Sequence, residues 1–491
     1  MLRFDLKQRQ SNTVAMITFW SQFAVYTINT VFILYLTRPI WKYGLGYSET
    51  KAYAFMGVTQ AMGYLMPMLG GYMADHVLGI RRSILYGTVL LAVAYLFVML
   101  SNFTVTQHGD FWFIAAYALV PVTNSLLMGT SSALVSRIFC DDPARSKAGM
   151  TIYYMSINVG GLLAAILAPQ LMETHYGPLT IFAIVFAGKA LAALNFIWRY
   201  ELFDNVIDSL DRKSMSKKQY TKLFSYLIVI YVATTLLYYF PYGSSYVLAI
   251  SCALGIFWFL LRTLNLPAKS RFKQFIAIAL IVEAIIFFIV YNQMNTTLIL
   301  FAANNSDLNF FGLKVAPANY QMVNPLTIIL LSLLLPSFYK KFHGFKIPYQ
   351  FAAGVALAGV GLLVMWFACL YATHGLINGN YLVLSYFIIT ISELWVSAIG
   401  LSMIGLYCEE HLLSFAMGAW YLAVSLSNVL SGRLAAFVAL PEKGIGVLQS
   451  LHIYQSYYLS MGLVTLLIGM LMGLIAVPML RWARSHEVAL Q

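Results

Sequence analysis

The sequence predicts an all-α integral membrane protein with about fourteen membrane-spanning helices. Three observations support this fold class. The 491 residues are 60% hydrophobic and only 10% charged, whereas a soluble domain carries roughly 25% charged residues. Apolar stretches recur from end to end, each near the ~20 residues that cross a bilayer. Lys and Arg collect in alternate loops, so the net charge of +12 indicates membrane topology rather than nucleic-acid binding.

The apolar stretches divide into six, two and six. We expect spans at residues 13–36, 52–74, 83–101, 111–138, 148–171, 178–199, 221–240, 246–262, 273–300, 318–338, 349–372, 380–406, 411–438 and 456–480. The two spans after the longest hydrophilic segment have few polar residues and are expected to face lipid. The predicted domains are therefore a six-helix bundle over 1–200, a linker over 201–222, two extra helices over 223–265, and a second six-helix bundle over 266–491.

The basic loops predict the orientation. With an even number of spans they all fall on one side, the cytoplasm, together with both termini, and the protein belongs in a plasma or bacterial inner membrane. These loops are Arg3/Lys7/Arg9, Arg81/Arg82, Arg145/Lys147, Arg212–Lys222, Arg262–Lys273, Lys340–Lys346 and Arg481/Arg484, and the main exceptions are Arg38, Lys42 and Lys51. The polar start, residues 1–10, is not a cleavable signal, so we expect the first span to be retained. We interpret the basic linker as a solvated loop touching anionic lipid.

The sequence contains no recognisable catalytic or cofactor motif. The four cysteines are scattered and have neither disulfide nor zinc-ligand spacing. The glycine pair at 70–71 is not a phosphate-binding loop, because no GK[ST] follows it. The histidines fall in loops or at span ends. We therefore expect no enzyme activity, cofactor or metal, and no nucleic-acid partner.

Polar side chains line one face of several predicted spans. Tyr154, Asn158 and Gly161 recur at i, i+4 and i+7, which places them on one face of a helix. An unpaired polar group is costly in hydrocarbon, so this face must meet other helices or water. Similar stripes hold Gln22, Tyr26 and Asn29; Gln60, Tyr64, Pro67 and Gly71; Asn124, Met128 and Ser131; Tyr291 to Thr297, including Gln293; Tyr320 and Asn324 before Pro325; and Trp420, Tyr421, Ser425 and Asn428. One stripe is typical of interhelical packing, but this many favours a shared hydrated cavity.

Three ionisable residues lie inside predicted spans, where a charge costs about 3 kcal/mol on insertion scales. Glu393 shares a face with Ser397 and Gly400, and we favour a carboxylate that holds a substrate ammonium or carries a proton over a neutral packed acid. For Lys189, a cavity charge and a neutral or snorkelling amine remain equally open. For Glu283, a functional role and an interfacial position also remain open.

The stretch GGYMADHVLGIRR (70–82) forms a short cytoplasmic turn. Its glycines, including Gly71, allow close helix approach, Asp75 is placed to cap or pair across the turn, and Arg81 and Arg82 anchor the next helix. This pattern favours a conformational gate over a catalytic site.

Several of these stretches resemble one family. GGYMADHVLG, DDPARSKAGMTIYYMSINVGG, NQMNTTLILFAANNSDLNFFGLKV followed by YQMVNPLTIILLS, and SELWVSAIGLSMI followed by MGAWYL are similar to motifs of the proton-dependent oligopeptide transporters of the major facilitator superfamily. The resemblance covers nearly the whole chain. It implies two six-helix bundles around a central cavity, alternating access, and two extra helices between the halves.

The resemblance also implies roles for individual residues. Tyr26, Tyr64, Asn158, Asn324 and Trp420 match substrate-pathway positions, and Glu393 with Ser397 matches the pair that receives a peptide's amino terminus. Asn29, Tyr154, Gln293 and Asn428 are added as candidates from the polar stripes. The resemblance implies no role for Lys189.

The sequence departs from the family on the first and fourth spans. The acidic positions of the first-helix motif hold Thr18 and Ser21, its arginine position holds Gln22, and the lysine position of the fourth helix matches Met128. Loss of the whole charge cluster avoids an uncompensated buried charge. Proton coupling through these helices, and recognition of a substrate carboxylate, are therefore in question.

We expect a transporter of short peptides or peptide-like amines that functions as a monomer, with Glu393 as cation site and proton-coupling candidate. The alternatives are a facilitator or exporter of amine-bearing compounds and a transport-inactive receptor on the same fold. An intramembrane enzyme would need a catalytic constellation that the sequence does not contain.

Overall fold

The computed structural model describes residues 5–206, 209–332, 334, 346–441 and 445–485. Within these ranges, twelve helices are long and apolar enough to cross a membrane. The predicted span 52–74 coincides with helix α2 (Glu49–Met73), which is not among the twelve, and 318–338 overlaps α15 (Val323–Ser332). Most of the predicted basic loop Lys340–Lys346 lies outside the described residues. The all-α membrane fold is therefore confirmed.

The chain forms two compact units. The N-terminal unit comprises Met1–Tyr47 and Met62–Pro241, and the C-terminal unit comprises Ser48–Ala61 and Tyr242–Gln491. The domain limits that the sequence suggests remain a prediction. The two extra helices belong to different units, α11 (Lys217–Tyr239) to the first and α12 (Pro241–Leu264) almost wholly to the second.

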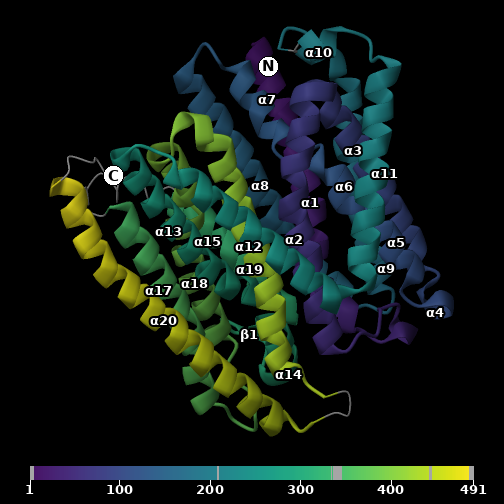
Figure 1. The fold of residues 1–491 in the computed structure, drawn as a ribbon. Coiled ribbons are helices and arrows are strands. Elements are labelled where there is room, and N and C mark those ends of the chain that lie inside the picture. The colour runs from purple at the N-terminus through teal and green to yellow at the C-terminus, as the bar shows by residue number, and fades with distance from the viewer. Residues whose placement is uncertain (1–4, 207–208, 333, 335–345, 442–444, 486–491) are drawn as a thin grey trace. The chain divides into compact units, whose positions relative to one another are not determined.

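The N-terminal unit is built around α1 (Leu6–Thr37), which packs along α8 (Pro143–Met172) and α9 (Gly177–Trp198) (Figure 1). Two glycines permit this close approach. A Cβ at Gly160 would lie 2.9 Å from the Phe19 carbonyl oxygen, and one at Gly188 would lie 3.2 Å from that of Trp20. The remaining elements are η1 (Ile40–Lys42), the π-helical turn η2 (Ala74–Leu78), α3 (Ile80–Asn102), α4 (Val105–His108), η3 (Tyr200–Phe203) and α10 (Ser209–Arg212).

The fourth predicted span is a broken helix. Residues 111–138 form α5 (Phe111–Tyr117), α6 (Leu119–Ser125) and α7 (Thr130–Ile138). The backbone turns at Gly129, whose φ of +89° is a conformation that glycine adopts without strain. Met128, at the position where the resemblance expects a lysine, lies at this break and is 38% exposed.

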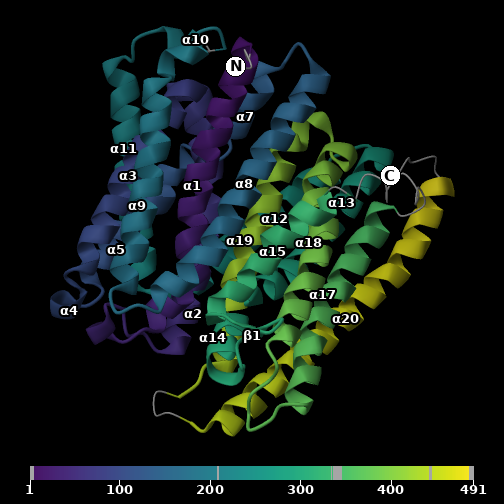
Figure 2. The same ribbon diagram turned by 180° about the vertical axis from the view of Figure 1, so that it is seen from behind.

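The C-terminal unit centres on α17 (Ile347–Leu370), which packs against α18 (Asn380–Tyr407) and the long α20 (Val447–Ser485) (Figure 2). Helix α13 (Ala268–Tyr291) contacts α17, α18 and α19 (Leu413–Ala435), and continues through η4 (Asn292–Asn295) into α14 (Thr297–Asn305). The short helices η5 (Pro317–Met322), η6 (Glu410–Leu412) and η7 (Ala436–Val438) complete this unit.

A small hairpin follows α14 and was not predicted. Strands β1 (Asn309–Phe310) and β2 (Leu313–Lys314) are antiparallel, with Asn309 opposite Lys314. The buried Asn305 donates from Nδ2 to the carbonyl oxygens of Gly375 and Val447, at 3.0 and 2.9 Å. This side chain ties the segment that leads to the hairpin to the loop before α18 and the start of α20.

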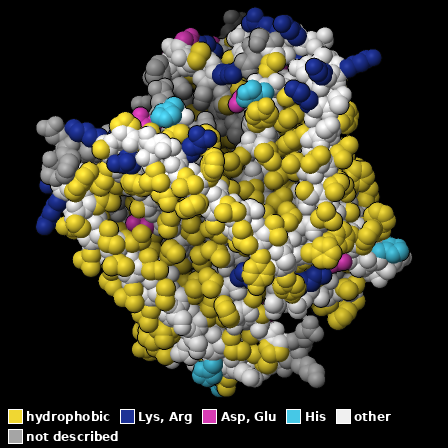
Figure 3. Space-filling model, viewed as in Figure 1, with side chains coloured by type: hydrophobic (Ala, Val, Ile, Leu, Met, Phe, Trp, Pro, Cys, Tyr) yellow, Lys and Arg dark blue, Asp and Glu magenta, His cyan; other side chains and the backbone are white. Residues whose placement is uncertain are grey.

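The extra helices expose apolar side chains, as expected of surfaces that face lipid. On α11 these are Phe224, Ile228, Val232 and Leu236, and on α12 Val247, Ile250, Leu254 and Trp258. Figure 3 shows apolar side chains over much of the visible face, with Lys and Arg gathered near the end where α10 and α11 meet. The linker residues Arg212, Lys213, Lys217 and Lys218 are all exposed there.

Candidate functional site

The C-terminal unit brings Glu393 of α18 together with Asn324 of α15. The Asn324 amide nitrogen donates to Glu393 Oε2 at 2.6 Å and to Thr390 Oγ1 at 3.2 Å. Tyr291, at the end of α13, also hydrogen-bonds the Glu393 carboxyl group. Three helices thus converge on one carboxylate, which is only half-buried. All of these partners are neutral.

The sequence suggested Glu393 and Asn324 as separate site residues, and the structure brings them into contact although they are 69 residues apart in the sequence. Ser397, one turn further along α18, is also half-buried. Tyr291 and Thr390 were not among the predicted site residues. Tyr291 begins the polar patch on the ninth predicted span, and that signal was available in the sequence.

Three of the residues predicted to contact substrate in this unit are buried inside it. Gln293 is fully buried and donates to Ile289 O and Ser431 Oγ, at 3.0 and 2.9 Å. Its Oε1 accepts from Thr297 Oγ1 and Tyr457 OH, at 2.9 and 3.0 Å. Its amide oxygen thus accepts two hydrogen bonds and its amide nitrogen donates two, and its role as a substrate contact stays a prediction.

Trp420 and Asn428 are also buried, and their roles as substrate contacts stay predictions. Trp420 is 4% exposed, its ring packs against Phe288 and Phe351, and it fills the space beside Gly400. Asn428 is 3% exposed and donates to the carbonyl of Val424 on its own helix at 2.9 Å, whereas its Oδ1 has no hydrogen-bond partner among the described residues. Helical periodicity gives the face of a residue but does not say whether that face meets water or another helix.

In the N-terminal unit, the predicted residues lie along α1, α2 and α8. Tyr26, Asn29 and Tyr64 are half-buried, and Tyr154 is 45% exposed. Asn158 is 6% exposed and donates to the Tyr154 carbonyl at 3.0 Å. Gly161 lies against the Tyr26 ring, where a Cβ would be 3.3 Å away. The stripe on α8 therefore meets the stripe on α1, and Tyr154 is its accessible member.

Lys189 lies midway along α9 and is 1% exposed. Its Nζ donates to the carbonyl oxygen of Ser21 at 2.9 Å and contacts Ser21 Oγ at 2.7 Å. The Tyr95 ring centroid is 5.9 Å from Nζ. The amine is therefore enclosed between helices, and the snorkelling alternative is excluded.

Glu283 of α13 is 6% exposed, and its Oε2 has no hydrogen-bond partner among the described residues. Its burial argues against the interfacial position that the sequence left open.

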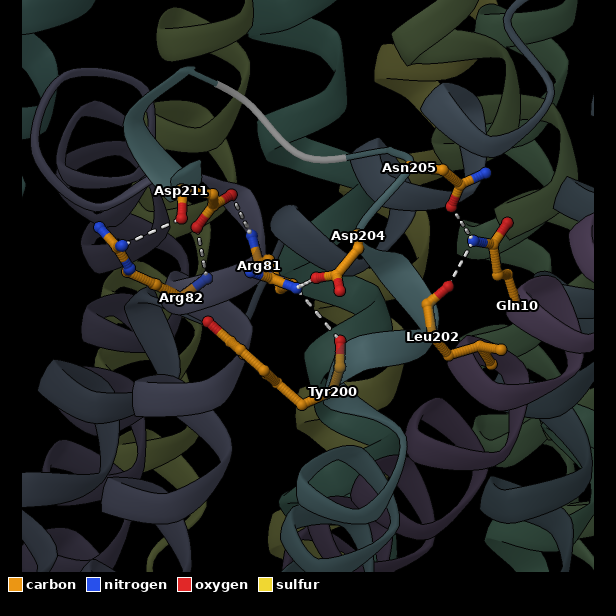
Figure 4. A network of polar contacts seen from close by, with 8 residues as sticks. All are labelled: Gln10, Arg81, Arg82, Tyr200, Leu202, Asp204, Asn205 and Asp211. Carbon is orange, nitrogen blue, oxygen red and sulfur yellow. Dashed lines mark hydrogen bonds and ion pairs between the residues drawn. The ribbon is translucent and has the colours of Figure 1, made fainter. Parts of the chain in front are cut away.

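The loop between α2 and α3 is held by the segment that follows α9 (Figure 4). The Arg81 guanidinium forms an ion pair with Asp204, donates to the Tyr200 carbonyl at 3.4 Å, and stacks 4.1 Å from the Tyr200 ring centroid. Arg82 donates to the carbonyl oxygens of Leu210 and Asp211, at 2.9 and 3.0 Å.

Asp211 caps the first turn of α3. Its two carboxylate oxygens accept from the backbone N–H groups of Arg81 and Arg82, each at 3.1 Å. Burial raises the pKa of Asp211, and these N–H donors partly offset that rise. The cap therefore comes from a residue 130 positions away, and not from Asp75, whose side chain is exposed.

The glycines of this loop also differ from expectation. The close approach occurs at Gly70, where a Cβ would lie 2.1 Å from the Ser125 carbonyl oxygen, whereas a Cβ at Gly71 would meet open space. Gly79 has a φ of +85°, and a Cβ there would lie 2.6 Å from Asp211 Cγ. Arg81 and Arg82 keep the predicted anchoring role, but their partners lie in the linker.

Comparison with known proteins agrees with this arrangement. The family model described as the POT family matches residues 81–451. Dipeptide and tripeptide permease A of Yersinia pestis is 31% identical over 471 residues, covering 95% of this chain and 91% of the relative. The permease A of Proteus mirabilis is 32% identical over 475 residues, covering 94% and 93%.

Solved structures give the same result. Tetrameric PepTSo2 has a TM-score of 0.85 at 25% identity, covering 97% of this chain and 99% of its own. A bacterial homologue of the human drug peptide transporters PepT1 and PepT2 has a TM-score of 0.84 at 25% identity, with the same coverage. The chain thus belongs to the POT family of membrane transporters.

Proposed function

We propose that this protein is a secondary transporter of di- and tripeptides, or of peptide-like compounds with a free amino group. The observation that carries the proposal is the Glu393 carboxylate, whose partners Asn324 and Tyr291 are neutral. A half-buried carboxylate without a cationic partner favours binding a cation or a proton. A peptide's amino terminus supplies such a cation. The curated relatives are named for dipeptides and tripeptides, which supports the same substrate class.

We propose that the protein lies in the inner membrane of a bacterium, with both termini in the cytoplasm. The arginine and lysine residues at 81–82, 145–147 and 212–222 support that orientation by the positive-inside rule. We propose that one chain forms a complete pathway, although the solved PepTSo2 structure is described as tetrameric. Tyr26, Asn29, Tyr64, Tyr154, Asn158, Asn324, Glu393 and Ser397 are the proposed substrate-contacting set.

A facilitator of amine-bearing compounds is the second candidate. Thr18, Ser21, Gln22 and Met128 stand where the resemblance expects charged residues, so the N-terminal unit offers less to a substrate carboxylate. Under this candidate Glu393 still binds the amine, but transport needs neither a carboxylate on the substrate nor a proton gradient.

Uptake by purified protein in liposomes tests both candidates. Labelled dialanine and trialanine are followed with and without an inward proton gradient, and protein-free liposomes are the control. We expect saturable uptake that N-acetyl-dialanine, which lacks the amine, does not compete for. Dialanine flux no greater than in empty liposomes would contradict the peptide proposal, and flux of dialanine amide alone would favour the second candidate.

A further inference from the structure

Lys189 is the one acidic or basic side chain in the interior of the six N-terminal spans. Within the predicted limits 13–36, 52–74, 83–101, 111–138, 148–171 and 178–199, the other Asp, Glu, Lys, Arg or His residues are Arg137 and Arg199, at span ends. A charge in such a position is costly, and such residues tend to mark ion or proton pathways. If the N-terminal unit binds a proton within the membrane on a group other than tyrosine, Lys189 is the group available.

The groups that face Lys189 are neutral. The elements packed against α9 are α1, α3, α8 and η3. From α1 the amine meets Ser21, and from α3 it meets the Tyr95 ring. The charged residues of these elements lie in terminal turns: Lys7, Arg9, Arg81, Arg82, Arg145, Lys147 and Glu201. Their tyrosines are Tyr26, Tyr35, Tyr86, Tyr95, Tyr153, Tyr154 and Tyr200. Lys189 forms no ion pair with a described carboxylate.

Ser21 suits both forms of the amine. A neutral amine donates to the Ser21 carbonyl and accepts from the Ser21 hydroxyl through its lone pair. An ammonium donates to both oxygens. The distances of 2.9 and 2.7 Å fit either arrangement. Gaining a proton therefore needs only rotation of one hydroxyl and no repacking of α9 against α1.

A row of buried hydroxyls leads from this amine to one end of the unit. Ser11, Thr18 and Ser21 lie at i, i+7 and i+10 on the same side of α1 and are 1%, 4% and 6% exposed. The hydroxyls of Ser11 and Thr18 have no partner among the described residues, and neither has Gln10 Oε1. Ser11 and Ser21 are about 15 Å apart along the helix axis. Buried polar groups that lack a partner are unusual and call for water, an ion or a catalytic role.

The end of the row that is farther from Lys189 lies where α1 meets the segment after α9. Gln10 Nε2 donates to the Leu202 carbonyl and to Asn205 Oδ1, at 2.7 and 2.5 Å, and Asn205 itself is exposed (Figure 4). The hydroxyl row (Ser11, Thr18 and Ser21) therefore starts beside an exposed polar side chain and ends on Lys189.

We propose that Lys189 is a proton-binding group of the N-terminal unit and that the hydroxyl row is its access route. This inference rests on the proposed transport function. A proton from water adds to the Nζ lone pair, forming one N–H bond, and leaves by the same route, with no other bond made or broken. Peptide accumulation is then driven by a group on α9 of the N-terminal unit, whereas Glu393 is on α18 of the C-terminal unit.

Two transport modes separate this role from a structural one. Counterflow exchanges labelled for unlabelled dialanine and needs no net proton movement, whereas accumulation above equilibrium needs it. In proteoliposomes, Lys189→Met should keep counterflow within about twofold of wild type and lose gradient-driven accumulation. Lys189→Arg should behave like Lys189→Met, because arginine keeps the positive charge but does not release its proton. A structural cation would be rescued by arginine, so accumulation by Lys189→Arg at the wild-type level would overturn the proposal.

The route is tested with matched threonine variants. Thr18→Val removes a hydroxyl of the row and should slow proton-driven uptake several-fold while leaving counterflow unchanged. Thr27→Val is the control, because the Thr27 hydroxyl is equally buried on α1 but already donates to the Phe23 carbonyl at 2.7 Å. If Lys189→Met fails to fold, equal behaviour of the two threonine variants overturns the proposal, and a selective effect of Thr18→Val supports it.

The wild-type protein distinguishes the two proposals. Exchange of dialanine without accumulation under a proton gradient would overturn the proton site and leave peptide transport intact. If dialanine is neither exchanged nor accumulated, the transport proposal fails. NMR of ¹⁵N-lysine-labelled protein then tests the amine directly. The signal that disappears in Lys189→Met is assigned to Lys189. The amine that it reports should change protonation state between about pH 5 and 9, as proton coupling near neutral pH requires. A protonation state that stays constant over this range would overturn the proposal.

Discussion

The two units carry ionisable groups of opposite sign, and they differ in how those groups are enclosed. In the C-terminal unit, Glu393 is half-buried and receives neutral donors from α15 and α13. In the N-terminal unit, Lys189 is 1% exposed and meets Ser21 on the neighbouring helix. A half-buried carboxylate can contact a ligand. An enclosed amine has no room for a ligand and can only gain or lose a proton. Glu393 is therefore suited to substrate recognition, and Lys189 is suited to proton coupling.

Removal of the carboxylate should have the largest effect. Glu393→Gln keeps the shape and an acceptor but loses the charge that binds an amino terminus. Hydrogen bonds to charged groups contribute about 1.5–3 kcal/mol, so dialanine affinity should fall about 10- to 100-fold. The measurement is competition for labelled dialanine uptake. Glu283→Gln, which changes another buried carboxylate of this unit, is the control and should leave affinity nearly unchanged. Equal dialanine affinity of Glu393→Gln and wild type would show that the Glu393 carboxylate does not recognise the amino terminus.

Loss of the amide beside the carboxylate should have a smaller effect on the same measurement. Asn324→Ala removes the donor at 2.6 Å from Glu393, so the carboxylate loses orientation but keeps its charge. We expect dialanine affinity to fall about tenfold, the equivalent of one hydrogen bond. Thr390→Val removes the other partner of Asn324 and should change affinity less. A larger effect for Thr390→Val than for Asn324→Ala would show that the amide does not position the carboxylate.

The linker contacts should affect stability rather than affinity. Gly79→Ala places a Cβ 2.6 Å from Asp211 Cγ at a φ of +85°. Such strain costs roughly 1–3 kcal/mol, so the melting temperature in detergent should fall by several degrees while the affinity of the folded protein is kept. Gly71→Ala is the matched control, since a Cβ there meets open space. If both variants melt alike, the Asp211 cap is not what holds this loop.

The smallest effect should come from two exposed ion pairs that join the starts of α1 and α8. Lys7 pairs with Asp141 at 2.5 Å, and Arg145 pairs with Asp5 at 2.6 Å. The Lys7 side chain lowers the pKa of Asp141, and the pKa of Asp5 is lowered first by the backbone N–H of Gln8 and then by Arg145. A lowered pKa means that this stabilisation is present above the unfolded pKa of about 3.9 and disappears as pH falls through the folded value.

Asp141→Asn should therefore melt slightly below wild type at pH 7, and the difference should vanish as the pH falls through the lowered pKa of Asp141. Melting curves of both proteins in one detergent at several pH values give the comparison. High salt should also reduce the difference at pH 7, because exposed pairs are screened. A difference that does not shrink as the pH is lowered would assign the effect to something other than the ion pair.

Much of the fold was predictable because the bilayer limits the alternatives. A helix about 20 residues long is the main way for an apolar segment to satisfy its backbone in lipid, so composition and length indicate the spans. Glu393 and Lys189 were also identifiable, because an ionisable residue in an apolar span stands out against its neighbours. The family motifs added the expectation that Glu393 and Ser397 receive a peptide's amino terminus.

Helical periodicity could not identify the partner of each polar face. Tyr154 is accessible, whereas Gln293, Trp420 and Asn428, which recur with similar spacing, are packed inside the unit. A stripe has the same sequence pattern whether water or a neighbouring helix covers it, because both satisfy the same hydrogen-bonding groups. Only side-chain contacts from distant segments distinguish the two, as the hydrogen bonds of Gln293 with Ser431 and Tyr457 do.

The sequence by itself determined the membrane class, the approximate spans, the family motifs and the two most informative charges, because these depend on local composition. The tertiary structure alone decided that Asp211 rather than Asp75 caps α3, that Lys189 contacts Ser21, and that Tyr291 joins Asn324 at Glu393. Each of these contacts joins residues tens to well over a hundred positions apart. Hydrogen bonds act over about 3 Å, so they depend on which helices pack together, and local sequence does not encode that packing.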